Sequence, residues 1–184
     1  GNNPRATTDN EYQHEAKEGG KSFFDLEPSG VDFVFKLNFQ GTLLPTQAFA
    51  KDMVEKKAGC ILNISSMNAY TPLTKIPAYS AAKAGISNFT AYMAHEVAMK
   101  FGEGIRVNAI APGFFLTEQN RTLLTNEDGS YTERGNDVIR QTPFNRFGRP
   151  EELCGTIQYL ISDASAFVTG TVAVVDGGFN IFAM

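Results

Sequence analysis

Cys60-Ile-Leu-Asn-Ile-Ser65 is a short apolar run of strand length, and Arg106-Val-Asn-Ala-Ile-Ala111 is a second one further along the chain. Between them, residues 77–101 have the length of one long helix, with Gly102 and Gly104 as signals that end it. Strands that alternate with helices predict an α/β fold with a parallel sheet. Strands that are apolar throughout are expected where helices cover both faces of such a sheet.

Elements on either side of this unit extend the alternation. A helix is expected over residues 31–57, with a kink or break at Pro45, because proline has no N–H to donate to a helical hydrogen bond. The sequence then predicts a mixed region over 113–149, a helix over 150–161 and a last strand over 171–175. Within the mixed region, a loop is expected over 126–130 and a short helix over 132–140.

The composition is that of an ordinary globular protein with a single domain over residues 1–184. Apolar residues make up 42% of the chain, charged residues 20%, and the net charge is −4. This acidic balance argues against nucleic acid as a partner, and no apolar run is long enough to cross a membrane. Cys60 and Cys154 favour free thiols in a reducing cytoplasm, with a single disulfide as the alternative. His14 and His95 have no partners at metal-ligand spacing, so no metal is expected.

Four polar residues indicate a chemistry. Tyr79 and Lys83 are four apart in the predicted helix and therefore share a face; Ser66 follows the first strand, and Asn38 lies in the helix expected before it. A free tyrosine, with a pKa near ~10, is a poor base at neutral pH. A nearby ammonium lowers that pKa toward the range in which acid–base catalysis is efficient. Ser66 can hydrogen-bond a substrate oxygen, whereas a serine–lysine hydrolase would need a nucleophile elbow that the sequence lacks.

This Asn/Ser/Tyr-x-x-x-Lys spacing resembles the catalytic tetrad of the short-chain dehydrogenase/reductase family, and residues 106–117 resemble its strand followed by Pro-Gly and a threonine. The resemblance implies a Rossmann-like, doubly wound parallel sheet and hydride transfer between NAD, or NADP, and an alcohol or carbonyl. It implies four catalytic residues: Asn38, Ser66, Tyr79 and Lys83. It implies cofactor contacts from Asn38, Tyr79, Lys83, Pro112, Gly113 and Thr117. In the family, the counterpart of Asn38 anchors a water that links the lysine to solvent.

The same resemblance implies that the amino-terminal strands of the sheet are missing from this chain. A dinucleotide site needs a glycine-rich turn between a strand and a helix, and the sequence has no such turn. Gly102-Glu-Gly104 lies between a helix and a strand, which is the opposite order. The chain is therefore expected to be the carboxyl-terminal part of a dehydrogenase and to be inactive alone. A fragment with a binding role only is the alternative.

Four loop segments resemble one branch of the family in particular. Those that begin Gly1-Asn-Asn-Pro, Asn38-Phe-Gln-Gly, Met67-Asn-Ala-Tyr and Phe114-Phe-Leu-Thr resemble the D-mannonate oxidoreductase (fructuronate reductase) branch, which interconverts D-mannonate and D-fructuronate with NAD. The gluconate 5-dehydrogenase branch shares much of this pattern and is the alternative. In the family, the region that corresponds to residues 113–149 is the substrate lid.

A sugar acid as substrate needs a cation for its carboxylate, and the planar fork of arginine suits both oxygens. Arg121, four residues after Thr117, is the first candidate, while Ser66 and Tyr79 are expected to bind the reacting oxygen. Arg5 and Lys75 are further candidates for the carboxylate. Arg146 is expected instead to stabilise the turn before the helix over 150–161.

The helix that carries Tyr79 also has a face of small residues, which lets another helix approach closely. These are Ser80, Ala81, Ala84, Gly85, Ser87 and Ala91. Packing within one subunit is one explanation. In the family this helix packs against a symmetry mate, which implies a homo-oligomer, either a dimer or a tetramer.

Overall fold

Three parallel strands form the sheet of the chain, whose computed structural model describes residues 1–9, 19–118 and 120–181. The strands are β1 (Gly59–Ile64), β2 (Ile105–Pro112) and β3 (Val172–Val175). β2 lies between the other two, with Gly59 opposite Ile105 and Ala109 opposite Val172. All three strands fall where the sequence predicts them.

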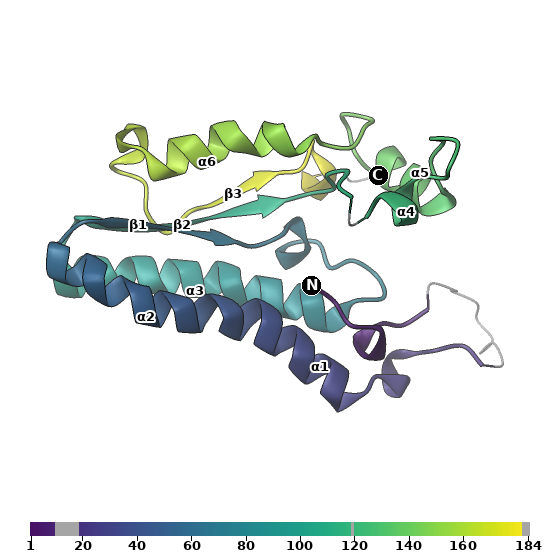
Figure 1. Cartoon of the computed structure of the whole chain (residues 1–184), viewed down its shortest axis with the longest axis horizontal. Coiled ribbons are helices and arrows are strands. Elements are labelled where there is room, and N and C mark those ends of the chain that lie inside the picture. The colour runs from purple at the N-terminus through teal and green to yellow at the C-terminus, as the bar shows by residue number, and fades with distance from the viewer. Residues whose placement is uncertain (10–18, 119, 182–184) are drawn as a thin grey trace.

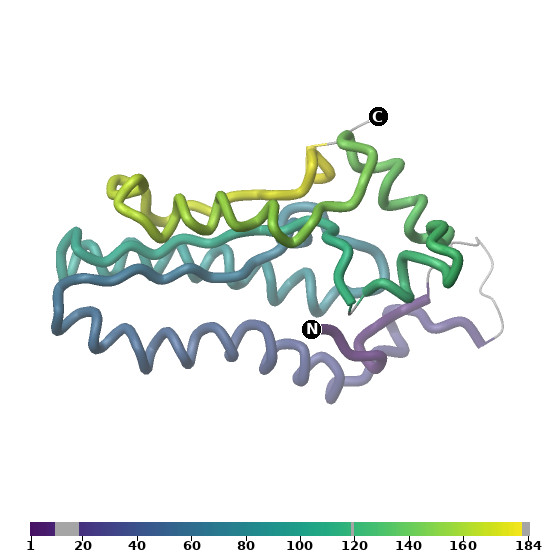
Figure 2. Tube along the Cα trace, turned by 45° about the horizontal axis from the view of Figure 1, so that its top comes forward, coloured from purple at the N-terminus to yellow at the C-terminus, as the bar shows by residue number. Residues whose placement is uncertain are grey.

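Helices cover both faces of this sheet (Figure 1). α2 (Gly41–Lys56) and α3 (Pro77–Phe101) lie on one face, and α6 (Cys154–Ile161) lies on the other. The turned view in Figure 2 shows the same three layers. Parallel neighbours need a long crossover connection, which α3 supplies between β1 and β2. The expected doubly wound α/β arrangement is confirmed.

The packing between α3 and the sheet explains why the strands are apolar throughout. Ala94 and Val97 of α3 pack with Ile105 and Val107 of β2, and all four are at most 3% exposed. Burial on this scale removes apolar surface from water at about 25 cal/mol per Å². It also fixes α3 against β2.

The helix expected over residues 31–57 is irregular at a different place from the one predicted. α1 (Pro28–Phe35) continues into a wider π-helical turn (Lys36–Gln40) and then into α2, which contains Pro45 without a break. The buried Asn38 side chain donates from Nδ2 to the carbonyl oxygen of Val34 at 2.8 Å. A side chain that enters the backbone ladder in this way distorts a helix. The irregularity in the helical pattern therefore lies at Asn38, and the break predicted as one outcome at Pro45 does not occur.

Residues 113–149 contain two short helices. α5 (Glu133–Arg140) begins after Thr132, whose Oγ1 accepts the N–H of Gly135 at 3.0 Å. This confirms the short helix predicted over 132–140, and a threonine is a residue type that helix starts favour as a cap. α4 (Arg121–Leu124) was not predicted; it is a single turn with one buried residue, Leu124. The helix predicted over 150–161 is present as a 3₁₀ turn (Pro150–Leu153) that continues into α6.

Candidate active site

The two serines that follow β1 have different partners. The N–H of Ser65 donates to the carbonyl oxygen of Ile110 at 2.8 Å, and its hydroxyl donates to the backbone carbonyl oxygen of Lys83 at 3.1 Å. These two bonds connect the chain after β1 to both β2 and α3. Ser66, 8% exposed, accepts the N–H of Asn68 at 3.3 Å. The sequence pointed to Ser66 alone, because the anchoring role of Ser65 depends on contacts distant in sequence.

Tyr79 and Lys83 lie at the start of α3, on the face toward the end of β1. The Tyr79 hydroxyl is hydrogen-bonded to the side chain of Ser66. The Lys83 ammonium lies 5.7 Å from the centre of the Tyr79 ring and donates to the carbonyl oxygen of Ile64 at 2.8 Å. The structure therefore brings Ser66, Tyr79 and Lys83 together at the carboxyl end of a parallel strand, where ligands bind in open α/β sheets.

The charges in this group differ from the expectation. Burial is the main influence on Tyr79 and raises the pKa of its hydroxyl, while the hydrogen bond with Ser66 acts in the opposite direction. Burial also lowers the pKa of Lys83. Removal from water disfavours the charged form of each residue, so the expectation that Lys83 lowers the pKa of Tyr79 is wrong for this structure. Tyr79 is a neutral phenol at neutral pH and can donate a proton to a carbonyl oxygen.

Asn38 lies in the π-helical turn, which packs against α3. Besides its bond to Val34, its Nδ2 donates to the carbonyl oxygen of Gly1 at 2.8 Å. Asn38 thus lies where the π-helical turn meets the helix that carries Lys83.

The Pro-Gly pair lies at the same edge of the sheet as Ser66. Pro112 is the last residue of β2, and Gly113 follows it and donates its N–H to the carbonyl oxygen of Val175 at 2.9 Å. A Cβ on Gly113 would lie 2.5 Å from that of Asp176 and 2.7 Å from its Cα. The glycine therefore allows the chain to pass close to the end of β3. Thr117 is exposed, and its N–H is bonded to Asn120 Oδ1 at 2.8 Å within its own loop.

Arg121 is not brought to the serine–tyrosine–lysine group. It is the first residue of α4, it is exposed, and it lines a hollow of about 630 Å³ together with Thr125, Tyr131 and other residues of its own region. Neither Ser66 nor Tyr79 lines this hollow. Its role toward a substrate carboxylate stays a prediction.

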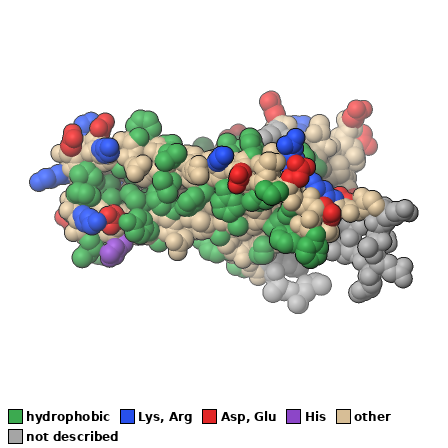
Figure 3. Space-filling view, turned by 90° about the horizontal axis from the view of Figure 1, so that it is seen from below, with side chains coloured by type: hydrophobic (Ala, Val, Ile, Leu, Met, Phe, Trp, Pro, Cys, Tyr) green, Lys and Arg blue, Asp and Glu red, His purple; other side chains and the backbone are tan. Residues whose placement is uncertain are grey.

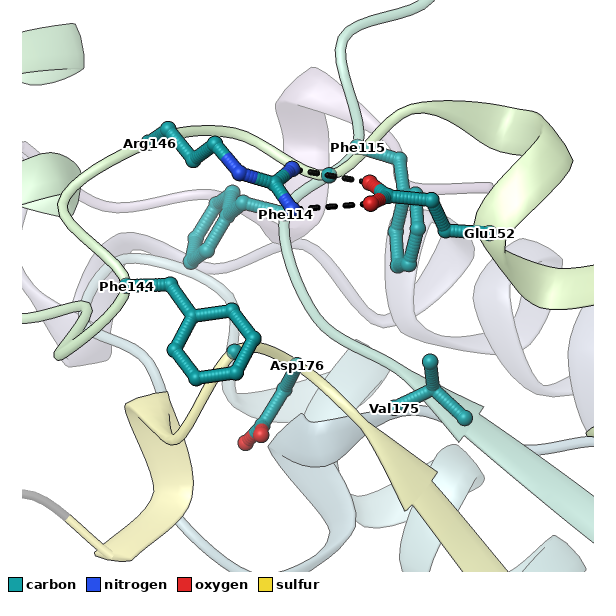
Figure 4. Close-up of a pocket in the computed structure, with 9 residues that line it drawn as sticks. Phe114, Phe115, Phe144, Arg146, Glu152, Val175 and Asp176 are labelled. Atoms are coloured by element: carbon teal, nitrogen blue, oxygen red, sulfur yellow. Dashed lines mark hydrogen bonds and ion pairs between the residues drawn. The ribbon is translucent and has the colours of Figure 1, made fainter.

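A smaller hollow of about 210 Å³ lies beside the ends of β2 and β3 (Figure 4). At its rim, Arg146 forms two parallel hydrogen bonds to Glu152, at 2.8 and 2.7 Å. These bonds, with the N–H of Arg149, lower the pKa of Glu152 to about 2. The pair links the turn at Arg146 to the 3₁₀ turn before α6, which confirms the structural role predicted for Arg146. Phe114 and Phe115 line the same hollow, and Phe115 is buried.

The described residues lack two other kinds of site. These residues contain no group of three or more His, Cys, Asp or Glu side chains placed to hold a metal ion; His14 lies outside them. No helix among them has both the length and the apolar character needed to cross a membrane. Cys60 and Cys154 are both free thiols.

Similar proteins match the chain throughout its length. A family described as "Enoyl-(Acyl carrier protein) reductase" matches residues 14–180. An uncharacterized oxidoreductase of Haemophilus influenzae is 55% identical over 186 residues, which cover 100% of this chain and 64% of the relative. The chain therefore spans slightly less than two thirds of that relative's length.

Solved structures agree with the fold. A Haemophilus influenzae protein provisionally assigned as a D-mannonate oxidoreductase, with NAD bound, has a TM-score of 0.90 and 55% identity, covering 100% of this chain and 65% of that one. A gluconate 5-dehydrogenase from Burkholderia cenocepacia, with NADP and tartrate, has a TM-score of 0.75 and 33% identity, covering 85% and 58%. Together with the Ser66–Tyr79–Lys83 group, these matches show that the chain belongs to the short-chain dehydrogenase/reductase family.

Proposed function

We propose that the whole protein is an NAD-dependent oxidoreductase that interconverts D-mannonate and D-fructuronate, with NADP as the alternative cofactor. The observation that carries the proposal is the group in which the neutral phenol of Tyr79 bonds to Ser66 beside the Lys83 ammonium. The Haemophilus influenzae protein with bound NAD supports both the cofactor and the sugar acid.

The residues present fit a nicotinamide cofactor. An ammonium carries three N–H donors, and Lys83 gives one of them to Ile64, which leaves donors for the hydroxyls of a ribose. Pro112, Gly113 and Thr117 follow the end of the neighbouring strand, and we assign them, with Asn38 and Tyr79, to the cofactor site. The cofactor supplies the hydride that reduces a carbonyl carbon, and the protein supplies position and a proton.

Each member of the group has a task in that reaction. Ser66 donates a hydrogen bond to the substrate oxygen and keeps it near the phenol. Tyr79 donates its proton to this oxygen in the reducing direction and accepts it in the oxidising direction. Positioned proton transfer of this kind contributes about 10²- to 10⁴-fold to a rate. Lys83 stabilises the phenolate that remains, and Asn38 connects the ammonium to solvent through water.

The substrate is assigned by its chemistry. We propose that residues 113–149 form a lid over the sugar and that a cation on this lid binds the carboxylate, with Arg121 as the candidate that the sequence suggests. An alternative is gluconate or a related polyol acid, and the gluconate 5-dehydrogenase structure, with tartrate bound, favours it as the second candidate. Kinetics with D-fructuronate and with 5-keto-D-gluconate separate the two candidates.

The test uses the whole protein, purified and supplied with D-fructuronate and NADH, and in the reverse direction with D-mannonate and NAD. Cofactor-dependent turnover of these two acids in preference to 5-keto-D-gluconate supports the assignment. Turnover of 5-keto-D-gluconate alone leaves the oxidoreductase intact and refutes the substrate. If neither acid is turned over but the protein binds one of them, a binding role replaces catalysis.

We also propose that the protein is a homo-oligomer of the cytoplasm. Hydrophobic side chains gather along the face of α2 and α3 (Figure 3). Leu44, Phe49 and Tyr92 are each more than half exposed there, and a hollow of about 540 Å³ runs between the helices. Large exposed apolar patches mark interaction sites, and a second copy of α2 and α3 is the partner we assign. On α3, the space above Gly85 is taken by Phe39, so part of the small-residue face serves packing within the chain.

A further inference from the structure

A cavity of about 720 Å³ lies between α5 and the loop that follows β1. This volume lies in the range of small-molecule sites, about 300–1,000 Å³. Its lining is mixed: Thr71, Thr74 and Gln141 provide polar groups, and Phe114 and Phe179 provide an apolar side. Such a lining suits a sugar, which presents hydroxyls along its edge and C–H groups on its faces.

The walls of this cavity are held by contacts between distant segments. Thr71 donates its hydroxyl to Asn180 Oδ1 at 2.7 Å, which joins the loop to the carboxyl-terminal turn. Asp176 accepts the N–H of Asn180 at 2.7 Å and shapes that turn. The rings of Phe114 and Phe179 pack with centres 5.3 Å apart. A site preformed in this way loses little entropy when a ligand binds.

The cavity adjoins the serine–tyrosine–lysine group through the core. Phe114, Val138 and Phe179 of its lining belong to one apolar cluster with Met67, which is 1% exposed. Met67 is the residue after Ser66. The apolar cluster behind the cavity therefore includes the sequence neighbour of the serine that bonds to Tyr79.

Arg134 of α5 lines the cavity and differs from the other arginines near it. Its Nε is buried and has no hydrogen-bond partner, and among the described residues its guanidinium forms no ion pair. Arg140, Arg146 and Arg149 each pair with a carboxylate. Buried donors are bonded in the great majority of cases, so the free N–H of Arg134 calls for an acceptor from outside the chain.

Two carboxylates of α5 share the cavity wall and do not compensate Arg134. Asp137 is paired with Arg140. Glu133 is exposed at the rim and forms no ion pair among the described residues. One uncompensated cation beside hydroxyl and carboxylate acceptors matches a ligand with one anionic end and several hydroxyl groups.

We propose that Arg134, rather than Arg121, binds the carboxylate of the sugar acid, with Thr71, Thr74 and Gln141 at its hydroxyls. This rests on the proposed function and names the residue that makes the site specific for an acid. The guanidinium fork places two parallel N–H groups on the two carboxylate oxygens, and Nε is one of the donors available to it.

The test measures binding and turnover separately in the whole protein. D-mannonate is titrated by calorimetry into protein saturated with the reduced nicotinamide nucleotide, a complex that cannot react. The variants are Arg134→Gln and Arg134→Lys, with Arg121→Gln as the competing candidate. Arg149→Gln is the matched control, because Arg149 is exposed and pairs with Glu152, away from the cavity lining. Thermal unfolding and affinity for the reduced nucleotide check that each variant is folded.

Arg134→Gln should raise the Kd of D-mannonate roughly 10- to 150-fold, as expected when a hydrogen bond to a charged group is lost. Arg134→Lys should recover part of this affinity, because it keeps the charge without the fork. Arg149→Gln should stay within about twofold. An unchanged Kd in a folded Arg134→Gln, a loss in Arg121→Gln instead, or no binding by the wild type would each overturn the inference. Binding that depends on Arg134 without turnover of D-fructuronate would refute the proposed function and leave this site standing.

Discussion

Replacement of Tyr79 by phenylalanine separates its chemical role from its structural one. The change removes a single oxygen atom and keeps the ring, which lies 5.7 Å from the Lys83 ammonium. The hydroxyl bonds to Ser66, and Ser66 keeps its contact with the N–H of Asn68 in the variant. Little of the folded structure therefore depends on the oxygen that is lost.

The two expected effects differ in size. The loss of one hydrogen bond should lower the free energy of unfolding by about 0.5–1.5 kcal/mol. The loss of the proton donor should lower turnover about 10²- to 10⁴-fold, which corresponds to about 2.7–5.4 kcal/mol in the barrier. A residue with only a packing role would show the first effect without the second.

Turnover of D-fructuronate by the whole protein is measured from the absorbance of the reduced nicotinamide. Urea unfolding of the same preparations measures the free energy of unfolding. Cofactor affinity should stay near that of the wild type, because the lysine that would bind the ribose is unchanged. A Tyr79→Phe variant that keeps more than about a tenth of the wild-type rate would refute the assignment of Tyr79 as the proton donor.

Three further predictions follow from the packing and the charges. Gly113→Ala should lower the free energy of unfolding by roughly 1–3 kcal/mol, because the new Cβ would lie 2.7 Å from the Cα of Asp176. Urea unfolding measures this difference. Gly155→Ala is the control, because nothing lies within 4 Å of a Cβ at that position. Glu152, whose pKa falls to about 2 in the folded chain, contributes stability that is complete above its unfolded value, about 4.3. That contribution is lost as the pH falls toward about 2. Urea unfolding should therefore show Glu152→Gln to be less stable than wild type near neutral pH and as stable as wild type at the acid end. A difference in unfolding free energy that stays constant with pH would contradict this. Leu44→Glu should reduce the mass measured by light scattering to that of one subunit. An unchanged mass would refute the α2–α3 face as the contact between subunits.

The sequence was most informative where the signal is local. Four-residue spacing on a helix places Tyr79 and Lys83 on one face by geometry alone, and an apolar run followed by a serine predicts Ser66 at the end of a strand. The structure confirms both placements. The short helix predicted over 132–140 is also confirmed.

The sequence-based predictions were wrong where a side-chain contact or burial outweighed a local rule. Proline predicts a break through its own ring, but the distortion occurs at Asn38, whose amide bonds to Val34. The ammonium of Lys83 was expected to lower the pKa of Tyr79. Burial, which no residue spacing reveals, raises it instead.

The sequence by itself determined the order of strands and helices and the α/β fold, because periodicity fixes these. The resemblance to a known family, read from the sequence, indicated Ser66, Tyr79 and Lys83 as site residues. Only the tertiary structure decided which arginine has a buried donor without a partner. Arg121 and Arg134 look alike in the sequence, yet one is exposed beside its own loop and the other has a buried donor without a partner at the cavity next to Met67. The physical reason is that an ion pair or an orphaned donor depends on segments brought together from distant parts of the chain.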